Sequence, residues 1–280
     1  MEHLIDLDRY PIDRPGSSEY SEMMDQLHAD LAKKGCAVLK GFATKDGTQI
    51  LAAEGDRTSR FAHASQSRTN AYFGNPNPDL DSRHPINQFF DRSNSFIPAD
   101  NFGEQSPLRQ LYEWDAFKQF VQQALQEPED KFFRYDDPLA DVIINMVEDG
   151  NGFPWHFDTN NFTLTLALQN AEGGGDFQYA PWIRTSEDEN FEAVRDVLEG
   201  TSTAIETLVL EPGDLQIFKG RYALHRVTPV TGDRPRYVAI FSFVDTPGMC
   251  GSPERTRQLY GRVLQHHLDR AGTRSDSLID

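Results

Sequence analysis

Apolar residues recur at helical spacing in the first half of the chain and in short strand-like runs in the second half. The helical spacing predicts helices over Tyr20–Lys33, Lys45–Arg60 and Pro107–Leu125. The first of these helices should end at Gly35, because glycine is the usual residue at a helix C-terminus. The apolar run Cys36–Phe42 predicts a strand between the first two helices.

Residues 61–101 show no sustained period and are rich in Asn, Ser, Asp, Pro and Arg. An irregular stretch of this length in a globular chain is typically either functional or poorly ordered. Its aromatic residues favour an ordered segment that packs over a site. These residues are Tyr72, Phe73, Phe89, Phe90 and Phe96.

From Leu139 onward, apolar runs alternate with Gly, Pro, Asn and Asp, a pattern typical of an antiparallel sandwich or barrel. The runs are Ala140–Asp149, Asn161–Gln169, Phe177–Ile183, Ala204–Phe218, Tyr222–Val230 and Arg236–Asp245. Helices are predicted over Glu187–Leu198 and Pro253–Leu268. We therefore expect an α+β protein with one domain over residues 1–280. It should comprise a helical N-terminal part and lid (1–138), a β core (139–250) and a C-terminal helix (251–280).

Charge limits the classes of partner. The chain has 44 Asp and Glu against 27 Lys and Arg, a formal net charge of −17. This charge repels nucleic acid and anionic membranes, so we expect a small-molecule partner and neither of those; the sequence predicts no particular oligomeric state. No run approaches the roughly 20 apolar residues that span a bilayer. The N-terminus does not resemble a signal peptide, and Cys36 and Cys250 are too few for a disulfide framework, so a cytoplasmic location is expected.

Candidate metal ligands lie in the β core. His156 and Asp158 are two residues apart, so at the end of a strand their side chains project from the same face. A second histidine, His225, follows in a later apolar run. Two histidines and one carboxylate form the facial triad of non-haem Fe(II) oxygenases. A single His-x-Asp tripeptide also arises by chance, so the surrounding sequence must support the assignment.

Two arginines follow the second histidine. Arg236 begins the apolar run Arg236–Asp245, and a charge at the start of a buried strand requires an anion. Arg234 lies two residues earlier, in a Gly-Asp-Arg-Pro turn. There it either forms a surface ion pair or, if the assigned register is off by two residues, binds the anion in place of Arg236.

These features resemble the Fe(II)/2-oxoglutarate-dependent dioxygenases. The resemblance covers residues 142–244 and rests on His156-Phe157-Asp158, His225 and Arg236, with a Gly-Gly-Gly-Asp-Phe segment at 173–177 and Leu-Glu-Pro-Gly-Asp at 210–214. It implies a double-stranded β-helix (jelly-roll, cupin-like) core with flanking helices. It also implies that His156, Asp158 and His225 bind Fe(II), that Arg236 holds 2-oxoglutarate, and that O2 is consumed with release of succinate and CO2.

More narrowly, the chain resembles the bacterial branch that contains free-amino-acid hydroxylases and radical halogenases. The shared segments include CAVLKGF, RTNAYF and PWHFDTNNFTLTLALQ. Halogenases of this branch replace the ligand carboxylate by Gly or Ala, whereas this chain keeps Asp158. The resemblance therefore implies hydroxylation of an unactivated carbon in a small carboxylate-bearing substrate, a free amino acid or a derivative.

Further candidates come from the irregular segment and the core. By resemblance, Arg92 would grip a substrate carboxylate, with Arg68 as a second candidate; the alternative for Arg92 is an exposed ion pair with Asp91 or Asp81. Thr163 and Thr165 share one face of a predicted strand. They point either to solvent or into the barrel, where Thr165 would lie near 2-oxoglutarate.

The adjacent pair His266-His267 in the last predicted helix diverges by about 100 degrees, so we expect solvent exposure rather than a metal site.

Two other functions stay open. A cupin-like metalloenzyme could use the same ligands without 2-oxoglutarate, although it would not need Arg236. A β-barrel ligand-binding protein without catalysis would not need the complete set His156, Asp158 and His225.

Overall fold

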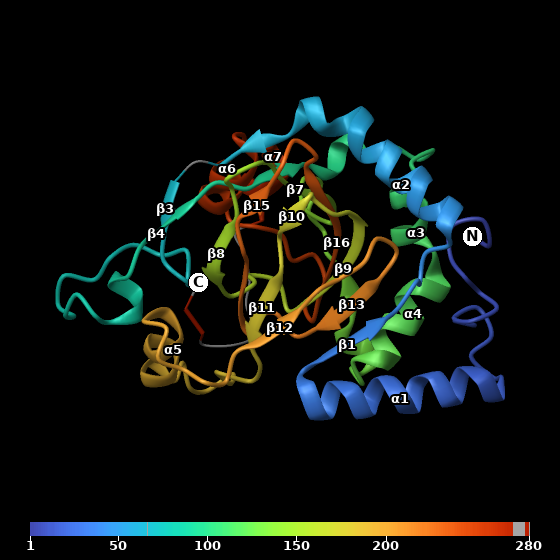
Figure 1. The fold of residues 1–280 in the computed structure, drawn as a ribbon, viewed down its shortest axis with the longest axis horizontal. Coiled ribbons are helices and arrows are strands. Elements are labelled where there is room, and N and C mark those ends of the chain that lie inside the picture. Colours follow the sequence, from blue (N-terminus) through green and yellow to red (C-terminus); the bar gives the residue numbers. More distant parts are fainter. Residues whose placement is uncertain (66, 271–277, 280) are drawn as a thin grey trace.

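Two antiparallel sheets form the framework of the protein. The structure is a computed structural model that describes residues 1–65, 67–270 and 278–279. The larger sheet has eight strands in the order β1-β13-β9-β16-β7-β5-β2, with β6 also paired to β16; the smaller has four in the order β12-β11-β14-β8 (Figure 1). The larger sheet comprises β1 (Cys36–Leu39), β2 (His63–Ala64), β5 (Ser95–Ile97), β6 (Phe133–Arg134), β7 (Val142–Val147), β9 (Phe162–Gln169), β13 (Leu215–Phe218) and β16 (Arg236–Val244). The smaller comprises β8 (Phe153–His156), β11 (Phe177–Ala180), β12 (Glu206–Leu208) and β14 (Leu224–Val227).

The central strand β16 separates the hydrophobic core from a cavity. Its residues alternate between the two faces of the sheet, as a strand requires. One set of side chains belongs to the main core cluster: Tyr237, Ala239, Phe241 and Phe243. The other set lines the cavity: Arg236, Val238, Ile240 and Ser242. Because both faces are buried, the strand is almost continuously apolar in sequence.

Helices cover the core side of the larger sheet. They are α1 (Ser18–Lys34), α2 (Lys45–Thr58), α3 (Pro107–Glu113) and α4 (Asp115–Ala124) (Figure 1). Leu27 of α1, Leu51 of α2 and Phe117 of α4 share one buried cluster with Phe241 of β16. The prediction for the end of α1 is confirmed, since Gly35 adopts the left-handed conformation (φ 66°) and its N–H donates to the Leu31 carbonyl.

Two predicted helices are each divided in two. The helix predicted over Pro107–Leu125 breaks at Trp114, whose backbone is extended and whose carbonyl accepts the first hydrogen bonds of α4. The helix predicted over Pro253–Leu268 ends at Gly261 (φ 71°), giving α6 (Pro253–Tyr260) and α7 (Gln265–Asp269). A Cβ at position 261 would lie 2.6 Å from the His63 ring, so glycine is required there.

The helix predicted over Glu187–Leu198 is shorter than expected and forms α5 (Phe191–Leu198). The preceding residues turn around Thr185, whose hydroxyl oxygen accepts hydrogen bonds from the backbone N–H groups of Glu187 and Asp188. These local bonds compete with helix formation.

The irregular segment is ordered by short pairings and by one buried amide. Strands β3 (Ser67–Thr69) and β4 (Phe90–Arg92) of this segment pair with each other; a separate two-stranded pairing, β10 (Gly173–Gly174) with β15 (Val230–Thr231), lies outside it. The Asn70 side chain accepts hydrogen bonds from the N–H groups of Tyr72 and Gly74 and donates to the Ile86 carbonyl. The segment lies on the opposite side of the sheets from α1 and α4 (Figure 1).

Both cysteines, Cys36 and Cys250, are buried and free. Among the described helices, none combines the length and the apolar character that crossing a membrane requires.

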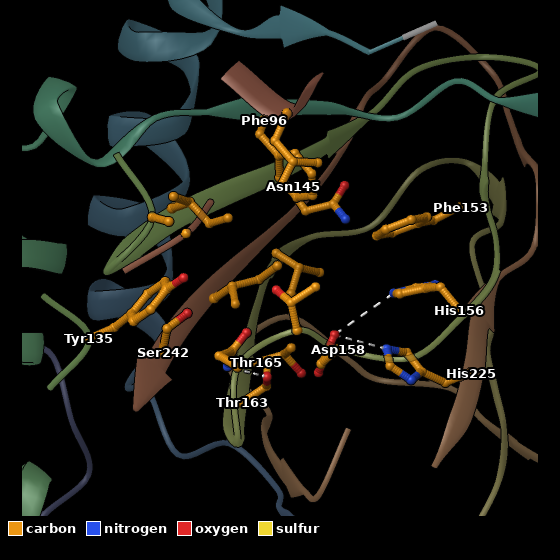
Figure 2. A pocket seen from close by; sticks show the side chains of 18 of the residues that line it. Phe96, Tyr135, Asn145, Phe153, His156, Asp158, Thr163, Thr165, His225 and Ser242 are labelled. Atoms are coloured by element: carbon orange, nitrogen blue, oxygen red, sulfur yellow. Dashed lines mark hydrogen bonds and ion pairs between the residues drawn. The ribbon is translucent and has the colours of Figure 1, made fainter. Parts of the chain in front are cut away.

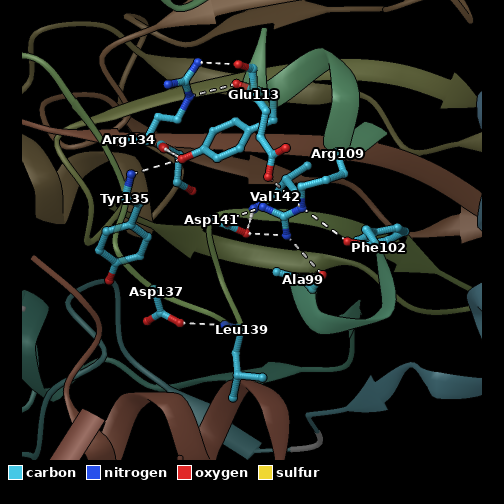
Figure 3. A network of polar contacts seen from close by, with 12 residues as sticks. Ala99, Phe102, Arg109, Glu113, Arg134, Tyr135, Asp137, Leu139, Asp141 and Val142 are labelled. Carbon is cyan, nitrogen blue, oxygen red and sulfur yellow. Dashed lines mark hydrogen bonds and ion pairs between the residues drawn. The ribbon is translucent and has the colours of Figure 1, made fainter. Parts of the chain in front are cut away.

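A partly buried ion pair attaches α3 to the start of β7 (Figure 3). Arg109 contacts both carboxylate oxygens of Asp141 and donates to the carbonyls of Ala99 and Phe102, each at 3.2 Å. Burial raises the pKa of Asp141 even though Arg109 favours its charged form. Removing one member of such a pair leaves a charge buried alone.

We expect Asp141→Ala to lower the free energy of unfolding by about 1–3 kcal/mol, the cost typical of leaving a buried hydrogen-bonding partner unsatisfied. Denaturant unfolding measures this change. Arg68→Ala provides the control, because Arg68 and its partner Asp91 are both exposed and this pair should contribute almost nothing. Equal midpoints for the two variants would contradict the assignment.

Candidate metal centre and active site

Two neighbouring strands place the predicted histidines face to face. Strand β14 pairs antiparallel with β8, and His225 lies directly opposite His156 in this register. Their ring centroids are 4.1 Å apart. Asp158 follows the end of β8, where its N–H donates to the Gly220 carbonyl at 3.2 Å. The three side chains point toward one another inside a cavity (Figure 2).

The three ligand atoms fit one metal ion. Asp158 Oδ1 lies 3.4 Å from His225 Nε2 and 3.9 Å from His156 Nε2, and one donor atom from each residue lies within 4.8 Å of the others. Asp158 Oδ2 is buried and has no hydrogen-bond partner among the described residues. A buried carboxylate oxygen without a donor is costly unless a cation completes its environment. The donor set of two imidazoles and one carboxylate suits Fe(II).

Backbone contacts orient both imidazoles for metal binding. The Nδ1 atoms of His156 and His225 lie 2.8 Å from the carbonyls of Pro154 and Ala223. A carbonyl only accepts hydrogen bonds, so each Nδ1 carries the proton and each Nε2 keeps its lone pair for a metal. Burial, and then the proximity of His225, lowers the pKa of His156 well below its usual value, which favours the neutral form.

Asp158 is held as a carboxylate. Burial raises its pKa, but the two imidazoles and the Thr163 hydroxyl outweigh that effect and bring the pKa to about 2. A Cβ at Gly220 would collide with Asp158 Oδ2. The absence of a side chain at position 220 therefore leaves the space that this carboxylate occupies.

The cavity lies between the two sheets. The larger sheet contributes Thr163 and Thr165 of β9, and the smaller contributes Phe177 of β11 and Val227 of β14. Both threonines face the cavity, so of the two orientations open from the sequence the inward one is observed and the solvent-facing one is not. The Thr165 hydroxyl donates to Gln216 Oε1 at 2.8 Å.

Arg236 contributes a buried positive charge to the same cavity. Its side chain is at the start of β16, the residue is only 6% exposed, and within the described residues its guanidinium makes no hydrogen bond. Burial lowers its pKa to about 10 despite the opposing effect of Asp176. Gly175 makes room for it, because a Cβ there would lie 2.8 Å from Arg236 Cδ. Arg234 is exposed, donates to the Ala171 carbonyl at 3.4 Å and does not line the cavity.

Arg92 occupies an unexpected environment. The expected alternative was an exposed ion pair with Asp91 or Asp81, but Arg92 is only 1% exposed and packs among the rings of Phe73, Phe96 and Phe153. Its Nε donates to Asn94 Oδ1 at 2.8 Å, while Nη1 and Nη2 are buried and find no partner in residues 1–65, 67–270 and 278–279. Burial lowers the pKa of Arg92 to about 9.

Arg68 lies apart from the metal ligands. It is exposed, its Nε is 3.4 Å from Asp91 Oδ1, and it is not among the residues that line the cavity.

Several polar residues that the sequence interpretation missed also line the cavity, among them Tyr135, Asp137, Asn145 and Arg255. Asn145 had a recognisable signal, as the single polar residue in the otherwise apolar β7. Its Oδ1 is buried without a hydrogen-bond partner. Arg255 had no comparable sequence signal, because it lies in a helix rich in charged residues.

The expectation for the histidine pair is wrong in part. His267 is fully buried, and its Nε2 lies 3.0 Å from Asp137 Oδ1, because α7 folds back onto the cavity wall. His266 is partly exposed.

Comparison with known proteins decides the family. The model of the family described as Halogenase D matches residues 20–250, most of the chain. The chain belongs to the Halogenase D family. It is thus an oxidoreductase whose fold is that of the 2-oxoglutarate/Fe(II) oxygenases. None of the curated proteins compared matches this Halogenase D member.

Three solved structures illustrate the fold shared by this Halogenase D member. A 2OG-Fe(II) oxygenase family oxidoreductase from Burkholderia pseudomallei has 12% identity and TM-score 0.52, covering 80% of this chain and 91% of its own. The non-heme alpha-ketoglutarate-dependent epimerase SnoN from nogalamycin biosynthesis has 12% identity and TM-score 0.56, with coverages of 80% and 82%. A Pseudomonas putida prolyl-4-hydroxylase has 16% identity and TM-score 0.50, with coverages of 80% and 100%.

We expect Asp158→Ala to weaken Fe(II) binding by at least tenfold while the fold persists, because the residue follows a strand end and contacts the cavity rather than the apolar core. Anaerobic titration with Fe(II) measures the affinity, and circular dichroism checks the fold. His266→Ala is the matched control, since that histidine lies outside the metal group. Unchanged Fe(II) affinity in Asp158→Ala would refute the ligand assignment.

Proposed function

We propose that this protein is an Fe(II)- and 2-oxoglutarate-dependent dioxygenase. It hydroxylates an unactivated carbon of a small carboxylate-bearing substrate, a free amino acid or a derivative, and releases succinate and CO2. The observation that supports this function best is that His156, Asp158 and His225 share one cavity with the buried, unpaired Arg236.

The side chains have distinct roles in this proposal. His156, Asp158 and His225 hold Fe(II) on one face and leave the cavity side open. Arg236 binds the distal carboxylate of 2-oxoglutarate through a charge-assisted contact, with Thr165 on the neighbouring strand β9. When bound, Fe(II) and 2-oxoglutarate supply the oxygen activation that no amino-acid side chain provides. The chain itself orients the substrate carbon and excludes water through the Phe153 and Phe177 rings.

Asp158 favours hydroxylation within a family described as Halogenase D. By the family resemblance, halogenases have Gly or Ala at the position of Asp158, which leaves a coordination position on the metal free for a halide. Here the carboxylate is present, and Gly220 accommodates its second oxygen. A halide would have to compete with this ligand.

Arg92 and Asn145 support a zwitterionic substrate. The two free Nη groups of Arg92 can donate to a carboxylate as a planar fork, and the unpaired Asn145 Oδ1 can accept from an ammonium group. The net charge of −17 also favours a substrate with a cationic group.

The organisation of the chain follows from the same proposal. The two sheets would form a double-stranded β-helix within one domain over residues 1–280, of which residues 66, 271–277 and 280 lie outside the described structure. The cytoplasmic location stays a prediction.

Two measurements test the reaction class. Anaerobic addition of Fe(II) and 2-oxoglutarate should give a weak visible charge-transfer band, and a panel of free amino acids and small acids should include one that stimulates succinate formation. A cupin-like metalloenzyme would bind the metal without the band. A binding protein would give no succinate with any compound.

We expect Arg236→Ala to raise the 2-oxoglutarate concentration for half-maximal turnover by well over tenfold. Loss of a buried charge-assisted partner costs on the order of 2–5 kcal/mol. Steady-state kinetics at varied 2-oxoglutarate measures the change. Arg234→Ala is the control, because Arg234 is outside the cavity. The reverse pattern would move the anchor to Arg234.

We expect no chlorinated product from the unmodified protein even in concentrated chloride, because Asp158 occupies the coordination position that a halide needs. Mass spectrometry of the product distinguishes an added oxygen from an added chlorine. A desaturated product is compatible with the proposed reaction class, whereas a chlorinated one is not.

A further inference from the structure

A cluster of buried N–H donors without acceptors lies beside the proposed metal centre. Arg255, on α6, lines the cavity, and its guanidinium carbon lies 3.4 Å from the centroid of the Phe73 ring. Within the part of the chain that the structure describes, its Nε is buried without a partner, while Nη1 donates to Gln258 Oε1 at 2.8 Å. The guanidinium carbon of Arg92 lies 5.8 Å from the same ring.

The unsatisfied groups of this cluster are all donors. They are Nη1 and Nη2 of Arg92, Nε of Arg255 and Nδ2 of Asn94. Asn94 is oriented by its own contact, since its Oδ1 accepts from Arg92 Nε. Buried donors without acceptors are costly, and several of them in one place point to a ligand rich in acceptor oxygens.

The acidic residues of the cavity are already engaged elsewhere. Asp137 accepts from His267 Nε2 at 3.0 Å and from the N–H groups of Leu139 and Gly251, each at 2.9 Å. Asp158 belongs to the metal group. The two guanidinium groups therefore lie beside Phe73 without an ion pair to a carboxylate among the described residues. Arg92 disfavours the charged form of Arg255, and Asp158 offsets this effect only in part.

Arg236 shows how much negative charge one buried guanidinium group requires from its ligand. There, one unpaired guanidinium matches one carboxylate of the proposed co-substrate. Two guanidinium groups beside one ring call for twice the charge, because a single carboxylate would leave one buried cation uncompensated.

We propose that Arg92 and Arg255 form a substrate-binding subsite for a doubly negative acid group, either two carboxylates or one phosphate ester. This inference rests on the proposed function, because it takes the cavity beside the metal as the substrate site. Arg255 is then a specificity-determining residue of the reaction. The Phe73 ring centroid is 5.6 Å from that of His156, so the acid group binds close to the metal, and the substrate is small.

Phe73 lies beside both arginine guanidinium groups and beside the His156 ring. It adopts φ 58°, an unusual conformation for a bulky residue. Arg92 is not itself a lining residue, whereas Phe73, Phe96 and Phe153 are. The acid group reaches the Arg92 nitrogens by displacing the Phe73 ring, and Arg255 meets it first.

Calorimetric titration tests the subsite by binding rather than turnover. The protein is loaded anaerobically with Fe(II) and saturating 2-oxoglutarate, so that Arg236 is occupied. The probes are matched pairs: L-glutamate against L-glutamine, and O-phospho-L-serine against L-serine, at pH 8. We expect one acidic member to bind at least tenfold more tightly than its neutral partner, and the pair that responds distinguishes a dicarboxylate from a phosphate ester.

Variants assign the effect to the arginines. Arg255→Gln and Arg92→Gln should each abolish the acidic preference, whereas Arg255→Lys should retain part of it, since lysine keeps the charge and loses the fork. Arg257→Gln, an exposed position on the same helix, is the control and should behave as the unmodified protein. Thermal unfolding confirms that each variant is folded.

The outcomes separate the subsite from the proposed function. Equal binding of acidic and neutral partners in both pairs, or an acidic preference that survives in folded Arg255→Gln, would overturn the subsite. The charge-transfer band of Fe(II) and 2-oxoglutarate needs no substrate, so its presence upholds the proposed function in that case. If the charge-transfer band is absent but the protein still binds the acidic probe more tightly in an Arg255-dependent way, the proposed reaction class is wrong and the subsite stands.

Discussion

Unpaired charge buried between two sheets is the constraint on which the rest of the structure depends. Asp158 has a buried oxygen with no donor, and Arg92, Arg236 and Arg255 have guanidinium groups with too few acceptors. Each arrangement disfavours folding unless other contacts compensate for it. The compensating contacts are the large apolar core on the other face of β16 and the rings that pack around the guanidinium groups of Arg92 and Arg255. The charged interior is tolerated because the core outside it is extensive.

Glycine makes this crowding possible at two of the charged residues. Gly220 leaves space for the Asp158 carboxylate, and Gly175 leaves space for the Arg236 side chain. Both glycines lie in loops between strands, away from the apolar core. Backbone packed this closely against a charged group excludes water, which strengthens electrostatic interactions in the cavity.

The sequence predicted that His156, Asp158 and His225 come together, as they do in the structure, because the information for this is local. One residue separates His156 from Asp158, so the alternation of a strand continued past its end places them on one face; the apolar run around His225 identified a second strand. The predicted orientation of Arg236 had the same origin, since it starts a long apolar strand. The helix breaks at Trp114 and Gly261 were missed because the apolar spacing continues through both positions.

The position of Arg255 could not be predicted for another reason. It lies on α6, at the far end of the chain from Arg92, and only tertiary packing against Phe73 brings the two guanidinium groups together. The burial of His267 likewise depends on α7 folding back to reach Asp137. Sequence periodicity describes which face of an element is apolar, but not which distant element covers it.

The direct opposition of His156 and His225 has a consequence for the pairing of β8 with β14. A slip of one residue in that pairing would turn one imidazole to the other face of the sheet. A metal ion held by both histidines therefore binds only the native alignment and stabilises it by mass action. The resistance of the smaller sheet to unfolding thus varies with the concentration of free metal, and the ion acts as a cross-link between strands as well as a reagent.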